Sequence, residues 1–177
     1  MSAAEKLLAR LQRVRLLLCD VDGVLTDGSV IMGAGGTELK RFSIQDGFGL
    51  RLLRDGGIRV GWVSARPSPA TTERANDLKI DFLHQSPALK VESIGDLLKE
   101  AGLEWDDIAY IGDDVVEVGA LRRAGFAAAP SDARPEAQAV AHYVCKVPGG
   151  HGAVREVVEV ILKAQGKWET VIAPFVA

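Results

Sequence analysis

Two carboxylates and a hydroxyl group follow an apolar segment near the start of the chain. The segment comprises residues 14–19, and Asp20, Asp22 and Thr26 come next. In parallel α/β sheets, strands that are buried on both faces are continuous apolar runs, and ligands bind beyond their carboxyl ends. Helix capping could explain one acid at this position, but not two. The spacing therefore indicates acid-dependent chemistry at the end of a buried strand, and an enzyme is the leading interpretation.

Three further junctions between predicted strands and helices carry polar groups of complementary type. They provide the hydroxyl of Ser64, the ammonium of Lys90, and the carboxylates of Asp113 and Asp114. Clustered carboxylates repel one another unless a cation lies among them, and Mg²⁺ binds carboxylate oxygens together with phosphate and water. The lysine and the serine hydroxyl can hold the remaining phosphate oxygens. The set predicts a site for a metal ion and a phosphoryl group.

Each of these residues also has a purely structural explanation. A serine before a turn commonly caps a helix, and a lysine at the start of a helix is commonly solvated. Asp113 and Asp114 could simply favour the positive end of the helix that follows them. His84 and His142 border predicted strands and are expected to be structural, whereas His151 lies in a glycine-rich turn. Only the combination of four such junctions in one chain favours the chemical interpretation.

The rest of the sequence alternates between short apolar runs and helical segments. Residues 28–43 interrupt this alternation, because a glycine-rich centre between two apolar runs is typical of a β-hairpin. The pattern predicts an α/β fold, a Rossmann-like doubly wound parallel sheet with a small β-hairpin insertion and no cap domain, in a single domain covering residues 1–177. The expected strands are 14–19, 58–63, 81–84, 108–111, 126–129 and 142–147. The expected helices are 46–54, 69–78, 89–101, 115–124, a short one after Pro135, and 152–165. Asp46 is expected to cap the first of these helices.

The composition argues against several classes of function. The chain has 177 residues, of which 47% are hydrophobic, 21 are basic and 24 are acidic, so the formal net charge is −3. Without a long block of like charge, general binding to nucleic acid or to a membrane is not expected. Cys19 and Cys145 lie in predicted strands and are expected to be buried free thiols, which predicts a cytoplasmic location. Residues 168–177 are too apolar for a solvated tail and are expected to dock on their own subunit or on a partner.

Four motifs of the chain occur in the order found in the haloacid dehalogenase superfamily. They are DVDGVLT at residues 20–26, the Ser64 site, Lys90, and GDD at residues 112–114. In these motifs the chain resembles the phosphohydrolases of that superfamily. The resemblance implies that Asp20 is a nucleophile that forms an aspartyl-phosphate, and that Asp22 protonates the leaving alcohol and then activates water. It also implies that Ser64 and Lys90 bind the transferring phosphoryl group.

The same resemblance implies a Mg²⁺ cofactor. Its expected ligands are Asp20, the backbone carbonyl of Asp22, and Asp113. Two residues depart from the superfamily pattern. The third acid of the usual GDDxxD motif is Glu117, one methylene longer than aspartate, and Ala65 stands where a glycine usually follows the serine or threonine. We expect these changes to retune metal binding and to crowd the phosphate loop, and not to abolish activity.

The intervals between the motifs leave no room for an inserted cap domain. An open phosphate site needs another element to exclude water and to select the substrate, and the hairpin of a neighbouring subunit would serve. Among capless members, the chain is similar to the 3-deoxy-D-manno-octulosonate 8-phosphate (KDO 8-phosphate) phosphatases of lipopolysaccharide precursor synthesis. The shared signatures are Lys40–Phe42, Asp46–Gly49 and Gly149–Glu156, with His151 where arginine is common. This resemblance implies a homotetramer in which the glycine-rich tail, from about residue 148, can close over a neighbouring active site.

The implied substrate is a sugar acid that carries a carboxylate as well as a phosphate. Arginine binds carboxylates through two parallel hydrogen bonds, so an arginine is needed in addition to Lys90. By the resemblance, Arg74 is expected to bind the carboxylate, Arg66 is typical of the octulosonate type, and Thr26 completes the substrate-binding set with Ser64. The structural alternative for Arg74 is an ordinary exposed arginine on a helix.

Other functions fit parts of the pattern. The chain could hydrolyse sugar phosphates with broader specificity or act on another sugar-acid phosphate of the nonulosonate 9-phosphate type. It could also store a phosphoryl group as a signalling domain does, or serve as a non-catalytic oligomerisation module. The position of Asp20 on the first strand, two residues before a second acid, favours turnover over storage. Retention of the complete set of acids, serine and lysine argues against a module without activity.

Overall fold

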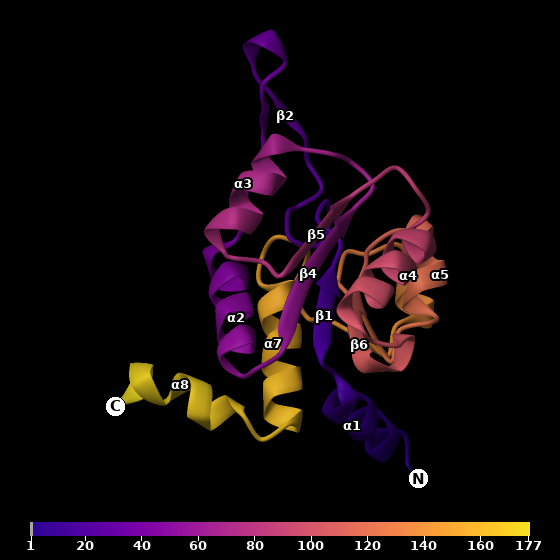
Figure 1. Ribbon diagram of the computed structural model, residues 1–177, viewed down its shortest axis with the longest axis vertical. Coiled ribbons are helices and arrows are strands. Elements are labelled where there is room, and N and C mark those ends of the chain that lie inside the picture. The colour runs from indigo at the N-terminus through magenta and orange to yellow at the C-terminus, as the bar shows by residue number, and fades with distance from the viewer. Residues whose placement is uncertain (1) are drawn as a thin grey trace.

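A six-stranded parallel sheet forms the centre of the molecule, with helices on both of its faces (Figure 1). The computed structural model describes residues 2–177. The strand order is β5-β4-β1-β6-β7-β8, so the chain starts in the middle of the sheet, builds one edge and then builds the other. This doubly wound arrangement confirms the predicted fold class. The strands are β1 (Leu16–Cys19), β4 (Arg59–Ser64), β5 (Phe82–Gln85), β6 (Ile108–Ile111), β7 (Phe126–Ala129) and β8 (Tyr143–Val144).

Alternating side chains along the strands create two hydrophobic cores. In β1, Leu17 and Cys19 point into one core, Leu16 and Leu18 point into the other, and all four are fully buried. One face is covered by α1 (Ala3–Arg13), α2 (Ile44–Asp55), α3 (Pro69–Asp77) and α7 (Ala153–Ala164), and the other by α4 (Lys90–Ala101), α5 (Val118–Leu121) and α6 (Pro135–Val140). Because both faces are covered, the central strands are apolar on both sides, and polar side chains can reach solvent only near the ends of these strands.

A two-stranded hairpin projects beyond the carboxyl edge of the sheet (Figure 1). In it, β2 (Ile31–Met32) pairs antiparallel with β3 (Glu38–Leu39) across a 3₁₀ turn. Gly35 in this turn has a φ of +71°, a left-handed conformation that glycine adopts without strain. The hairpin and α2 are the elements between β1 and β4, and α3 and β5 are those between β4 and α4. Within residues 2–177, no cap domain interrupts the sheet.

Two elements are shorter than the sequence pattern predicts. The helix expected at residues 115–124 is a 3₁₀ turn, Val115–Glu117, followed by the single helical turn of α5. The Glu117 side chain folds back onto two backbone amides of the preceding loop, and this capping contact tightens the first turn. The strand expected at residues 142–147 is reduced to β8, because the amide of Lys146 binds the carboxylate of Glu156 in place of the neighbouring strand.

The cap predicted for α2 is wrong. Ser43 is the N-cap residue, and its Oγ accepts a hydrogen bond from the amide of Asp46 at 3.3 Å. The carboxylate of Asp46 points away from its own helix and binds two backbone amides at the N-terminus of α7. The local sequence pattern identified a capping aspartate but assigned it to the wrong helix.

The apolar end of the chain forms the helix α8 (Trp168–Val176) and docks on its own subunit. Val171 is buried, and the rings of Phe175 and Phe48 of α2 pack in a T-shaped arrangement with their centroids 5.2 Å apart. Arg155 and Lys163 of α7 lie over the ring of Trp168. Figure 1 shows that α8 lies at the end of the molecule opposite to the hairpin.

The state of the two cysteines and the lengths of the helices can be compared with what the sequence predicts. Cys19 and Cys145 are buried and form no disulfide, as predicted. Among the helices of the described chain, none is both long enough and apolar enough to cross a lipid bilayer.

Candidate active site

The central strands bring the predicted site residues to one edge of the sheet. β1 lies between β4 and β6, and Cys19 is level with both Trp62 and Ile111. The segments that follow these positions therefore leave the sheet side by side. They line a cleft with a volume of about 160 Å³, together with the start of α4. The lining residues are Asp20, Asp22, Ser64, Ala65, Arg66, Lys90, Asp113, Asp114, Val116 and Glu117.

Asp20 and Lys90 form a buried ion pair in this cleft. Their exposed fractions are 6% and 4%. The ammonium of Lys90 donates hydrogen bonds to the Asp20 carboxylate and, at 2.5 Å, to the carbonyl oxygen of Val63, and it lies 3.5 Å from Oε1 of Glu117. Lys90 is the first residue of α4, so the start of this helix fixes the position of its backbone beside the cleft. A fixed cation beside Asp20 can neutralise the negative charge of an incoming phosphoryl group.

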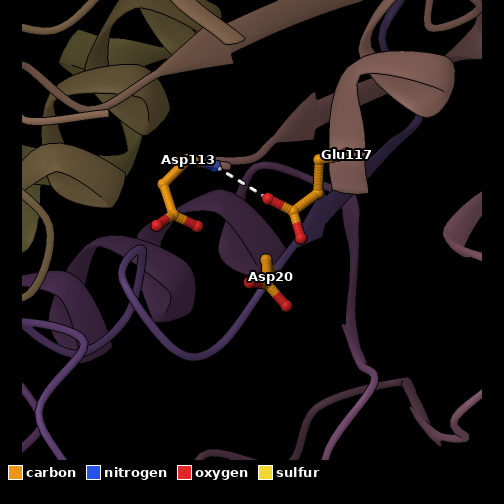
Figure 2. A group of neighbouring side chains, drawn as sticks. All are labelled: Asp20, Asp113 and Glu117. Carbon is orange, nitrogen blue, oxygen red and sulfur yellow. Dashed lines mark hydrogen bonds between the residues drawn. The ribbon is translucent and has the colours of Figure 1, made fainter. Parts of the chain in front are cut away.

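Three carboxylates meet beside this ion pair (Figure 2). Oxygen atoms of Asp20, Asp113 and Glu117 all lie within 4.8 Å of one another. Burial and the charge of Glu117 raise the pKa of Asp20 to about 7. Burial and the charge of Asp20 raise the pKa of Asp113 to about 7. One lysine cannot balance three carboxylates of which two are buried and the third, Asp113, is half-buried, so this donor set fits a divalent cation that prefers oxygen ligands.

Glu117 is the member of this cluster that the sequence did not assign to the metal. It is 1% exposed, and its Oε2 accepts hydrogen bonds from the amides of Asp113 at 3.0 Å and Asp114 at 2.9 Å. The longer side chain fits because it packs over Gly112, where an added Cβ would lie 2.8 Å from the Glu117 Cβ. Although glutamate replaces the usual aspartate here, its carboxylate still lies beside Asp20.

The loop after Asp20 depends on glycine. Gly23 has a φ of +90°, and a Cβ added there would lie 2.1 Å from Oδ2 of Asp113. The hydroxyl of Thr26 accepts hydrogen bonds from the amides of Gly23 at 3.3 Å and Gly28 at 3.2 Å, and donates to the carbonyl of Val21. Thr26 is buried and does not line the cleft. This corrects the expected substrate contact of Thr26, whose hydroxyl organises the catalytic loop from within.

Two residues of the hairpin segment contact side chains that line the cleft, and the sequence pattern did not assign these two residues to the site. Lys40, whose side chain is 1% exposed, forms an ion pair with Asp22. Glu38 accepts a hydrogen bond from Nη1 of Arg66 at 2.7 Å and another from Oγ of Ser68 at 2.9 Å. Lys40 belongs to a recognised family signature, but the spacing alone gave no sign that the hairpin folds back over the acids.

Ser64 and Arg66 occupy the wall of the cleft that β4 provides. Ser64 is the last residue of the strand and is 2% exposed, and its Oγ accepts a hydrogen bond from the amide of Arg66 at 3.1 Å. This turn places the hydroxyl at the carboxyl end of the strand, where it lines the cleft. The guanidinium of Arg66 lies between Glu38 and Asp22, with Nε 3.9 Å from an Asp22 oxygen.

Arg74 lies outside the cleft. It projects from α3 into a second groove of about 430 Å³ between that helix and the hairpin, and its Nη1 pairs with Asp77 at 2.5 Å. Among the described contacts, its buried Nε has no hydrogen-bond partner. Lys40 lines this second groove and also binds Asp22 in the cleft, so the two depressions adjoin at Lys40.

The parallel sheet and the acids at its carboxyl edge define a phosphohydrolase of the haloacid dehalogenase superfamily. A solved hydrolase of this superfamily from Legionella pneumophila superposes with a TM-score of 0.93 and 36% identity, covering 98% of this chain and 95% of that chain. No protein-family model matches the chain.

Two relatives narrow the class to a family. The 3-deoxy-D-manno-octulosonate 8-phosphate phosphatase KdsC of Yersinia pestis is 40% identical over 166 residues, which cover 94% of this chain and 89% of the relative. The enzyme of the same name from Moraxella catarrhalis, solved in complex with magnesium, phosphate and KDO, is 38% identical with a TM-score of 0.93 and covers 97% of this chain and 98% of that chain. The chain belongs to the family of KDO 8-phosphate phosphatases.

Proposed function

We propose that the protein hydrolyses KDO 8-phosphate to KDO and inorganic phosphate, with Mg²⁺ as its cofactor, in lipopolysaccharide precursor synthesis. The observation that carries the proposal is the buried carboxylate of Asp20, which Lys90 holds beside the buried Glu117 and the half-buried Asp113. The substrate named for the relatives, and the magnesium, phosphate and KDO in the Moraxella catarrhalis structure, support the choice of substrate and metal.

The proposed reaction consists of two transfers of one phosphoryl group. In the first, a carboxylate oxygen of Asp20 attacks phosphorus, the bond from phosphorus to the sugar oxygen breaks, and Asp22 gives its proton to that oxygen. In the second, Asp22 takes a proton from water, whose oxygen attacks phosphorus and releases phosphate from Asp20. Lys90 and Ser64 hold the phosphate oxygens that do not react. Asp20 and Asp113 would hold Mg²⁺ with Glu117 beside them, and the ion would supply further positive charge to stabilise the transferring phosphoryl group.

Phosphate release from a panel of sugar phosphates tests the proposed substrate. KDO 8-phosphate should give the highest kcat/KM, ahead of nonulosonate 9-phosphates and simple hexose phosphates. Arg66 supports this order, because the nonulosonate enzymes that resemble this fold tend to carry an acid at that position. Equal kcat/KM values across the panel would contradict the proposal and would indicate a phosphatase of broad specificity.

The volume of the cleft suggests where the sugar lies. At about 160 Å³ it is smaller than the roughly 300–1,000 Å³ of most ligand pockets, so it suits the phosphoryl group and leaves the sugar acid outside. We infer that the sugar passes Lys40 and extends into the adjoining groove, where Arg74 binds its carboxylate. Arg66 would contact the sugar at the border of the cleft, after the substrate has displaced Glu38 from its guanidinium.

Replacing Arg74 by alanine should affect one substrate and not another. We expect Arg74→Ala to raise the KM for KDO 8-phosphate by roughly 10- to 100-fold, because a charge-assisted contact is lost. Hydrolysis of 4-nitrophenyl phosphate, which has no carboxylate, should stay within about twofold of the unaltered protein. Arg51→Ala is the matched control, since Arg51 is an exposed arginine of α2 paired with Asp55. Unchanged kinetics of Arg74→Ala on KDO 8-phosphate would remove Arg74 from the site.

Metal binding should depend on pH around neutrality. The pKa values of Asp20 and Asp113 are each raised to about 7, so in the metal-free protein these acids hold protons below that pH, and Mg²⁺ must displace them. The affinity for Mg²⁺ should therefore rise as the pH increases, by at least about tenfold between pH 6 and pH 8, and level off above that range. Titration calorimetry at the two pH values measures this change, and equal affinities would contradict it.

We propose a homotetramer in the cytoplasm. The hairpin exposes a row of apolar side chains on both of its strands, which is typical of an interface. These residues are Val30, Ile31, Met32 and Leu39. Measurement of the molecular mass in solution tests the assembly. The two buried thiols support a reducing compartment.

A further inference from the structure

Two signature segments of the sequence meet at one buried contact outside the lining of the cleft. Asp46 begins the first segment, and Gly152 and Arg155 belong to the second. Asp46 is 1% exposed, its Oδ2 accepts a hydrogen bond from the amide of Gly152 at 3.2 Å, and its Oδ1 accepts one from the amide of Arg155 at 2.8 Å. The partners are separated by 106 and 109 positions in the sequence.

Asp46 supplies the N-terminal cap that α7 cannot supply for itself. The N-cap residue of α7 is Gly152, which has a φ of +103° and no side chain to bind the free amides of the first turn. A carboxylate at this end of a helix also interacts favourably with the helix dipole. Gly49, three residues after Asp46 on α2, allows the two helices to come close, since an added Cβ would lie 2.9 Å from Cδ of Arg155.

The glycine turn that leads into α7 packs against the back of the catalytic loop. The amide of Gly150 donates a hydrogen bond to the carbonyl of Val24 at 2.9 Å. A Cβ added at Gly149 would lie 1.9 Å from the carbonyl oxygen of Gly23, and one added at Gly150 would lie 2.6 Å from the amide nitrogen of Asp27. The turn therefore supports the loop directly, backbone against backbone.

We propose that Asp46 is a positioning residue for catalysis. By capping α7 it holds the glycine turn, residues 149–152, against the catalytic loop, residues 20–28, and so fixes the position of Asp22. The other side of the loop rests on Asp113, whose Oδ2 would lie 2.1 Å from a Cβ at Gly23. Asp46 does not line the cleft. The inference rests on the proposed phosphatase function of this site.

Asp46→Asn tests the role with little change in shape. Asparagine offers one acceptor oxygen and turns an NH₂ group toward a backbone amide that needs an acceptor. We expect kcat to fall by roughly 10- to 100-fold on both KDO 8-phosphate and 4-nitrophenyl phosphate, because small displacements of catalytic groups are costly. The KM values should change by less than about threefold. The matched control is Ser2→Ala, which removes the cap of α1 and should leave kcat within about twofold of the unaltered protein.

A second variant separates positioning from simple loss of stability. Gly150→Ala should press on the catalytic loop from the same side and lower kcat. If both changes act through the glycine turn, the kcat loss of the double variant should match the larger single loss and not the product of the two. Multiplying losses, or a folded Asp46→Asn protein with unaltered kcat, would overturn the proposal. If the Asp46→Asn protein does not fold, an unaltered kcat in Gly150→Ala would likewise overturn the proposal.

Hydrogen exchange gives a readout that does not depend on the substrate. Amides of residues 20–28 and 149–152 should exchange faster in Asp46→Asn than in the unaltered protein, and not in Ser2→Ala. Unchanged exchange in both segments would overturn the positioning role. The two proposals can fail separately. If the unaltered protein hydrolyses 4-nitrophenyl phosphate but not KDO 8-phosphate, the proposed substrate is rejected. If Asp46→Asn then loses the hydrolysis of 4-nitrophenyl phosphate, the positioning role of Asp46 is retained.

Discussion

Asp20→Asn should abolish turnover while leaving the fold intact. The amide has the size of the carboxylate but cannot attack phosphorus, so kcat should fall by a factor of roughly 10⁴ or more. Asp20 is buried at the end of the central strand, and its carboxylate accepts a hydrogen bond from Lys90. Phosphate release under saturating Mg²⁺ and KDO 8-phosphate measures the effect.

Asp55→Asn is the control for this experiment, because Asp55 lies on the surface at the end of α2. It should retain full activity. If the Asp20→Asn protein released phosphate as fast as the unaltered protein, the activity would come from a contaminating phosphatase, and this cleft would not be its source.

Lys90→Met should lower both kcat and the free energy of unfolding. Methionine has a similar length but no charge, so Asp20 and Glu117 would lose the cation that lies between them. Removing one partner from a buried ion pair typically costs about 3–5 kcal/mol. We expect the free energy of unfolding of the metal-free protein to fall by about 3 kcal/mol at pH 8, and kcat to fall by at least about a thousandfold.

The destabilisation in Lys90→Met should depend on pH. Burial raises the pKa of both Asp20 and Glu117, so at pH 6 these acids can take up protons and the missing lysine matters less. The loss of stability should thus be larger at pH 8 than at pH 6, and Mg²⁺ should recover part of it. Denaturant unfolding at both pH values tests this. Lys99→Met is the matched control, since Lys99 is an exposed lysine of the same helix; an equal loss in the two variants would contradict the argument.

The position of the site could be predicted because it follows from the strands alone. Each apolar run ends where its strand leaves the core, so Asp20, Ser64 and Asp113 had to emerge at the same edge of a parallel sheet. The alternation of strands and helices predicted the doubly wound sheet, and the short intervals between the motifs predicted that no cap domain is inserted. Glu117 was known as a departure from the family pattern, but its place beside Asp20 depends on a side chain that folds back on the backbone.

The contacts that could not be predicted all join distant segments. The pairing of Lys40 with Asp22 depends on how the hairpin folds over the sheet, which residue spacing does not encode. Asp46 has the sequence signature of a local cap, yet its carboxylate binds a helix that begins more than a hundred residues later. Thr26 seemed free to bind substrate because sequence shows a hydroxyl near acids and not the backbone amides that bind it.

The link between Asp46 and α7 has a consequence for the newly made protein. The nucleophile emerges from the ribosome early, with the first strand, whereas the helix that steadies the catalytic loop is made almost last. A nascent chain can therefore build most of the sheet before its phosphatase centre is supported. Chains released prematurely, before Arg155, would contain every proposed catalytic residue and would still lack the brace that α7 gives to the loop.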